Sequence, residues 1–75
     1  MNNHVGRMWQ INDGLSVADN IEVAIDYFRG KYGDTFTVVM MRPELCERVN
    51  GDTGLKIVPD ESMTPGHIIF FSKGV

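Results

Sequence analysis

Two runs of four apolar residues constrain the fold of this chain more than any other feature of its sequence. The first is Val38-Val39-Met40-Met41 and the second is Ile68-Ile69-Phe70-Phe71. Both are far too short to span a bilayer, and their β-branched and aromatic residues favour strands. Because successive side chains of a strand point to opposite faces, each run presents apolar groups to both faces of a sheet. We therefore predict two buried strands in a sheet that needs cover on both sides.

A long amphipathic helix is predicted between Ser16 and Gly33. Ser16 is a favourable N-cap, and Asp19 follows it at the spacing of a capping-box variant. Gly33 suits the left-handed residue that ends many helices. The apolar arc consists of Val17, Ala18, Ile21, Ala24, Ile25, Phe28 and Tyr32, and the opposite arc of Asp19, Glu22, Asp26 and Arg29. We expect a helix over residues 17–32 that lies on one face of the sheet.

Shorter elements complete the prediction. They are an edge strand at residues 8–11, a central strand at 35–41, a helix of one or two turns that begins at Pro43, and strands at 55–58 and 67–72. The segment 42–54 is long enough for a crossover, so the second and third strands can run parallel, with the last strand returning antiparallel. The expected fold is α+β within one small α/β domain, residues 1–75: a three- to four-stranded mixed sheet, one long helix on one face and a short second helix. Residues 1–15 form a less regular N-terminal segment or the edge strand.

The order of these elements resembles a known type of small protein. The chain has Lys31-Tyr32-Gly33 at the end of the helix, Gly54-Leu55-Lys56-Ile57-Val58 at the third strand, and Pro65-Gly66-His67 before the last strand. This pattern resembles small microbial α/β proteins with the order helix, KYG, strand, then PGH and strand, to which no activity is assigned. The resemblance covers residues 17–72, and it implies a fold without any catalytic residue to carry over.

Charge and cysteine content exclude several classes of function. Seven Lys and Arg residues stand against ten Asp and Glu, the net charge is −3, and the basic residues are scattered. A nucleic-acid interface needs a basic stripe, so we expect no nucleic-acid partner. Cys46 is the only cysteine, which rules out an internal disulfide and a four-thiolate zinc site, and Glu44 and Glu47 should raise its thiol pKa. We expect a cytoplasmic protein without a membrane segment, a bound metal or a cofactor.

Four polar residues are candidates for a ligand-binding edge. If the second and third strands are parallel, then Arg42, Asp60 and Glu61 follow their carboxyl ends, and His67 begins the last strand at the same edge. These side chains offer a guanidinium for anions, carboxylates and an imidazole for proton transfer. The alternative is that Arg42 forms a surface ion pair and that His67 only opens a strand after the Pro65-Gly66 turn.

The second apolar face of the sheet suggests protein association. Either the short helix and the N-terminal segment cover this face, or a second subunit does. The candidate interface residues are Met8, Trp9, Met40 and Met41. We expect a non-enzymatic interaction or assembly module that forms homo-oligomers or binds another protein. The alternative is a small ligand-binding protein or enzyme that uses the polar edge.

Overall fold

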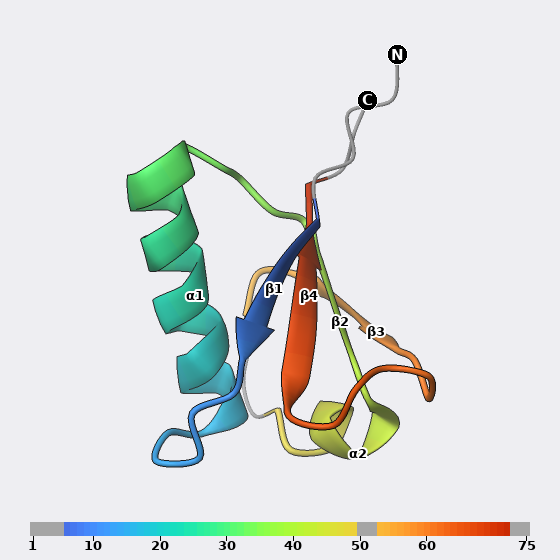
Figure 1. Ribbon diagram of the computed structural model, residues 1–75. Coiled ribbons are helices and arrows are strands. Elements are labelled where there is room, and N and C mark those ends of the chain that lie inside the picture. Colours follow the sequence, from blue (N-terminus) through green and yellow to red (C-terminus); the bar gives the residue numbers. More distant parts are fainter. Residues whose placement is uncertain (1–5, 50–52, 73–75) are drawn as a thin grey trace.

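A computed structural model describes residues 6–49 and 53–72 of the 75-residue chain. In chain order its elements are β1 (Gly6–Gln10), α1 (Val17–Tyr32), β2 (Val38–Met41), α2 (Pro43–Cys46), β3 (Lys56–Pro59) and β4 (His67–Phe71) (Figure 1). The four strands form one sheet in the order β1-β4-β2-β3. In the described part of the chain, neither helix has the length and apolar character needed to cross a membrane.

The sheet is mixed, as the sequence predicts. β4 runs antiparallel to both β1 and β2, whereas β2 and β3 are parallel and are connected through α2. The predicted α+β fold, with a four-stranded mixed sheet, one long helix and a short second helix, is therefore confirmed. Of the expected N-terminal segment, residues 6–15 are described, and they include β1 at an edge of the sheet.

Helix α1 begins and ends at the residues that the sequence indicates. The Ser16 hydroxyl accepts a hydrogen bond from the Asp19 amide at 3.0 Å. Gly33 has a φ of 72°, and its amide donates to the Arg29 carbonyl at 2.9 Å. Both ends thus satisfy backbone groups that a helix otherwise leaves unpaired, which fixes α1 at sixteen residues.

The hydrophobic core lies between α1 and one face of the sheet. Its sheet side is formed by Val39, Met41, Ile68 and Phe70, each fully buried, and its helix side by Val17, Ile21, Ala24 and Phe28. Leu45 of α2 packs into this same core. The short helix and β1 therefore do not supply a layer for the second face, because α2 joins the first core and β1 extends the sheet sideways (Figure 1).

Tyr32 lies on the predicted arc, where it stacks on Phe28, but it is not buried in the core. Its side chain is 47% exposed, because α1 extends beyond the sheet at this end. The Arg7 guanidinium of β1 lies 3.8 Å above the Tyr32 ring and is also bonded to Asp34, with 2.8 Å between Nε and Oδ2. Tyr32 thus fastens the end of the helix to the edge strand rather than filling the core.

Candidate functional site

The face of the sheet turned away from α1 carries a continuous apolar row. Met8 pairs with Ile69, Ile69 with Met40, and Met40 with Val58, so one residue from each strand contributes to the row. A second row beside it runs through Gly6, Phe71, Val38 and Lys56, and Gln10 and His67 pair below. We call these ten residues the open face.

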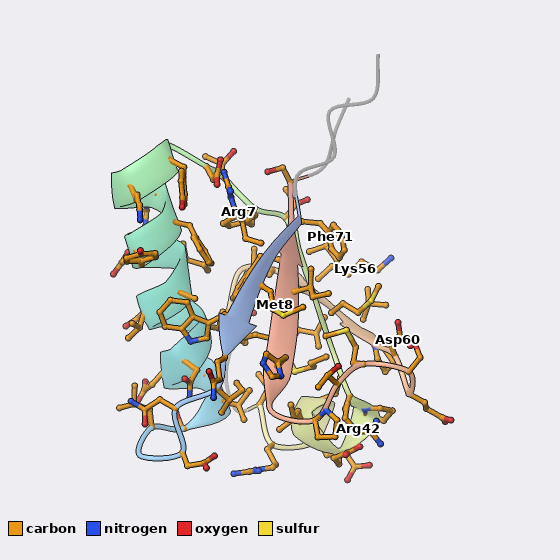
Figure 2. All side chains as sticks on the ribbon, in the orientation of Figure 1. Arg7, Met8, Arg42, Lys56, Asp60 and Phe71 are labelled. Carbon is orange, nitrogen blue, oxygen red and sulfur yellow. The ribbon has the colours of Figure 1, made fainter. Side chains whose placement is uncertain are left out.

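No residue of the open face is buried. Met8 is 57% exposed, and the other apolar side chains of the face are only partly covered. On the opposite face the alternating residues Val39, Met41, Ile68 and Phe70 have at most a trace of exposed surface. Because side chains alternate along a strand, each apolar run places one set of residues in the core under α1 and the other set on the open face. Figure 2 shows the two sides of the sheet, with Arg7 on the α1 side and Phe71 on the other.

Gly6 makes room on the open face for an aromatic ring. A Cβ placed on Gly6 would stand 3.3 Å from Cε1 of Phe71 on the neighbouring strand. The Phe71 ring therefore lies across the Gly6 backbone and fills the space that a side chain would take.

Opposite charges stand at the two ends of β3 on this face. Lys56 is the only formally charged residue of the open face. The Asp60 amide donates to the Met41 carbonyl at 2.9 Å, which continues the strand ladder by one residue. Residues 56, 58 and 60 therefore point to the same side, with Lys56 before Val58 and Asp60 after it (Figure 2). The Asp60 Oδ1 accepts from the Ser62 hydroxyl at 2.7 Å and the Ser62 amide at 2.9 Å, and these bonds lower the pKa of Asp60.

The structure divides the four interface candidates between the two faces. Met8 and Met40 lie on the open face, whereas Trp9 and Met41 point to the α1 side. Met41 is fully buried, and Trp9 packs edge-on against Phe28, with 5.7 Å between the ring centroids. Strand alternation thus removes Trp9 and Met41 from a surface shared with Met8 and Met40.

The interface candidates predicted from the sequence do not include four other apolar residues of the open face. They are Val38, Val58, Ile69 and Phe71. The runs themselves do not say which alternate set faces the helix, since both sets are equally apolar. Val38 lies two residues before Met40 and therefore on the same face of β2. The other three residues can be found only from the strand register, which the folded sheet supplies.

The four residues of the predicted polar edge lie at the ends of β2, β3 and β4, and Arg42, Asp60 and His67 bond to groups of the chain itself. The Arg42 Nε donates to Glu44 at 2.6 Å, and its Nη1 donates to the carbonyls of Glu61 at 2.9 Å and Met63 at 3.0 Å. The bond from Arg42 is the main reason that the pKa of Glu44 is lowered. Arg42 therefore holds the loop after β3 in place, and a guanidinium committed to two carbonyls is poorly placed to capture an anion.

The other members of this edge offer little for ligand chemistry. His67 Nδ1 lies 3.2 Å from the Pro65 carbonyl, and Asp60 is bonded to Ser62. Glu61 is exposed, and its main-chain carbonyl accepts a hydrogen bond from Arg42. Among residues 6–49 and 53–72 no three His, Cys, Asp or Glu side chains are grouped so that they could hold a metal ion.

Cys46 has the properties of a structural thiol. Burial is the largest cause that raises its pKa, and the charges of Glu44 and Glu47 raise it further, in the direction expected from the sequence. Its Sγ lies 3.9 Å from the Met41 carbonyl, next to the core. A nucleophilic cysteine needs the opposite environment, one that favours the thiolate.

A shallow depression lies between α1 and the segment that leads to β2. Its lining consists of Ile25, Arg29, Asp34, Thr35 and Phe36, and its volume is about 220 Å³. Ligand pockets are usually larger, at roughly 300–1,000 Å³. The charged residues of the lining are paired elsewhere, Arg29 with Asp26 and Asp34 with Arg7. The open face is therefore the more prominent surface feature.

Comparison with known proteins gives no match to a family model, to a curated protein or to a solved structure. The function of the chain is consequently argued from its own geometry.

Proposed function

We propose that this chain is a non-enzymatic interaction module that assembles with protein partners, and with itself, through the open face. The observation that supports the proposal is the row Met8–Ile69–Met40–Val58, which crosses all four strands and in which no residue is buried by the described part of the chain. Methionine is common at such surfaces because its flexible thioether adapts to different partners. Large apolar patches on a folded surface are typical of association sites.

The size of the open face favours reversible association. Four strands of four or five residues give a projected area of roughly 300 Å², whereas a standard interface buries about 800 Å² of accessible surface on each partner. Side chains that protrude, together with loops at the rim, add to the projected area. We therefore expect an interface at the small end of the range, with association that depends on concentration in the micromolar range or above.

The charge of the open face favours a protein partner over a nucleic acid. Lys56 is its single formal cation, and the chain as a whole carries a net charge of −3. Binding of a phosphate backbone requires several cations on one surface. A mostly neutral, apolar surface is instead complementary to a similar surface on a protein.

Light scattering over a wide range of protein concentration tests the proposal. We expect the wild-type mass to rise above the 8.4 kDa of one chain as the concentration increases. Met40→Lys places a charge at the centre of the row and should shift the midpoint of association to a concentration at least about tenfold higher. The matched control is Val23→Lys, since Val23 is 45% exposed on α1 and away from the open face. A wild-type chain that stays monomeric throughout, or a Met40→Lys chain that associates like wild type, contradicts the proposal.

A further inference from the structure

Lys56 and Asp60 mark the two ends of the open face along its β3 side. They lie two residues before and two residues after Val58, which belongs to the apolar row. At about 3.3 Å per residue the two charges are roughly 13 Å apart along the strand direction, too far to pair within one chain. Each of them is thus available to a charge on another molecule, although Asp60 is also bonded to Ser62.

We propose that the partner on the open face is a second copy of this chain, stacked face to face about a two-fold axis that runs along the row Met8–Val58. This inference rests on the proposed function and specifies its partner and geometry. A rotation about that axis reverses the strand direction between the two copies. Lys56 of each copy then lies opposite Asp60 of the other, so one interface contains two symmetric pairs of opposite charge.

The apolar residues agree with the same axis. A two-fold axis along the row places each row residue, including Met40 and Ile69, over its own counterpart. An axis parallel to the strands would instead place Lys56 over Gly6 of the second copy, where no carboxylate is present. Of these two axes, only the one along the row stacks the apolar rows on each other and also places Lys56 opposite Asp60.

The acidic surface of α1 supports stacking through this face. Asp19, Glu22 and Asp26 are exposed on the helix, which covers the opposite side of the sheet (Figure 1). Face-to-face stacking gives four layers, helix, sheet, sheet and helix, with the acidic surfaces outermost. Those surfaces are then separated by both sheets, a distance greater than the Debye length of about 8 Å at physiological salt. Two chains that each carry a net charge of −3 can therefore approach through their least acidic side.

Charge exchange between the two positions tests the geometry. Lys56→Asp alone places two carboxylates opposite each other at both ends of the interface, and Asp60→Lys alone places two ammonium groups there. Each variant should raise the dissociation constant of its own homodimer by about tenfold at low salt. The double variant Lys56→Asp/Asp60→Lys should recover wild-type association, because the pairs are restored with exchanged signs.

Mixing the two single variants provides the most selective measurement. In the mixed pair, Asp at position 56 of one chain faces Lys at position 60 of the other, while the remaining contact is the native pair. The equimolar mixture should therefore associate about as tightly as wild type, although neither variant does so alone. Thermal melting of each variant checks that it folds, since Asp60→Lys also loses the bonds to Ser62.

The outcomes separate the two proposals. If wild type associates and Met40→Lys weakens it, but the mixture is no tighter than its components, the stacking geometry is wrong while the proposed function stands. A monomeric wild type removes both. A Cys46→Ser background gives a second measurement, in which a short bifunctional thiol-alkylating reagent should cross-link Met40→Cys between two chains and should not cross-link Val23→Cys. Absence of the Met40→Cys cross-link in an associating chain overturns face-to-face stacking in favour of pairing through the β1 edge.

Discussion

Asn20 bonds to the backbone of Asn12 through both ends of its carboxamide. Its Nδ2 donates to the Asn12 carbonyl at 3.0 Å, and its Oδ1 accepts from the Asn12 amide at 2.8 Å. Asn20 is completely buried on α1, and the same Nδ2 also lies within hydrogen-bonding distance of the carbonyls of Leu15 and Ser16. One side chain thus organises the loop that joins the edge strand β1 to the helix.

Replacement of Asn20 should be strongly destabilising. Asn20→Asp keeps the shape but exchanges the donating NH₂ for an oxygen that faces three carbonyls, and we expect a loss of about 3 kcal/mol in the free energy of unfolding. Urea denaturation followed by circular dichroism measures the loss. Asp19→Asn is a suitable control on the same helix, because the Asp19 side chain is exposed. A loss below that of an ordinary surface substitution would show that the network does not hold the loop.

The two arginines paired with aspartates should respond differently to replacement by lysine. Arg7 is bonded to Asp34 and stacked on Tyr32, and its side chain is only 31% exposed. Arg7→Lys keeps the charge but loses the planar stacking, which should cost about 1 kcal/mol. Arg29 pairs with Asp26 at the surface, where both side chains are more than half exposed. Arg29→Lys should therefore change the unfolding midpoint hardly at all, and equal effects of the two substitutions would contradict this assignment.

Two glycines should give opposite results on substitution by alanine. Gly30 lies within α1, and an added Cβ would meet nothing within 4 Å. Gly30→Ala should stabilise the chain by about 0.5–1 kcal/mol, since alanine restricts the unfolded chain and favours the helix. Gly6→Ala pushes a methyl group against the Phe71 ring and should instead destabilise the sheet. Thermal melts of the two variants, which should move in opposite directions from wild type, test this prediction.

The Cys46 thiol should react slowly at neutral pH. Burial and the neighbouring carboxylates raise its pKa, so less thiolate is present in the folded chain than in an unfolded one. The raised pKa also determines how the contribution of Cys46 to stability changes with pH. The folded state retains the thiol proton more tightly, so the contribution to stability is complete below the unfolded pKa and is lost as the pH rises through the folded pKa. Alkylation rates measured against pH should give an apparent pKa above that of a urea-unfolded sample, and a lower value would contradict the assignment.

The sequence predicts the elements of this fold better than it predicts the surface they create. Helix α1 is fully specified by Ser16, Gly33 and its apolar arc, because capping and periodicity are local properties. The parallel pairing of β2 and β3 follows from the crossover length and is also confirmed. The strand predicted at residues 35–41 begins later, at Val38, although Thr37 already bonds to β3 and β4 through its backbone.

The candidate site depends on relationships that are not local. The run Ile68-Ile69-Phe70-Phe71 is apolar on both sides, so its pattern does not reveal that Ile68 and Phe70 are buried while Ile69 and Phe71 lie on the open face. Asn20 was also missed, because a lone amide on a helix carries no periodic signal. Its role appears only when the loop folds back over α1. Packing partners, rather than propensities, decide both cases.

The position of β4 has a consequence for synthesis of the chain. It is the last of the described strands in chain order, yet it lies between β1 and β2 and is the only neighbour of β1 among them. Before β4 is synthesised, β1 and the β2–β3 pair lack the strand that joins them. Helix α1 also lacks part of the sheet surface against which it packs. The sheet therefore closes after translation of its final strand, and long-range closure of this kind is a slow step during which the unpaired apolar strands are exposed to chaperones and to one another.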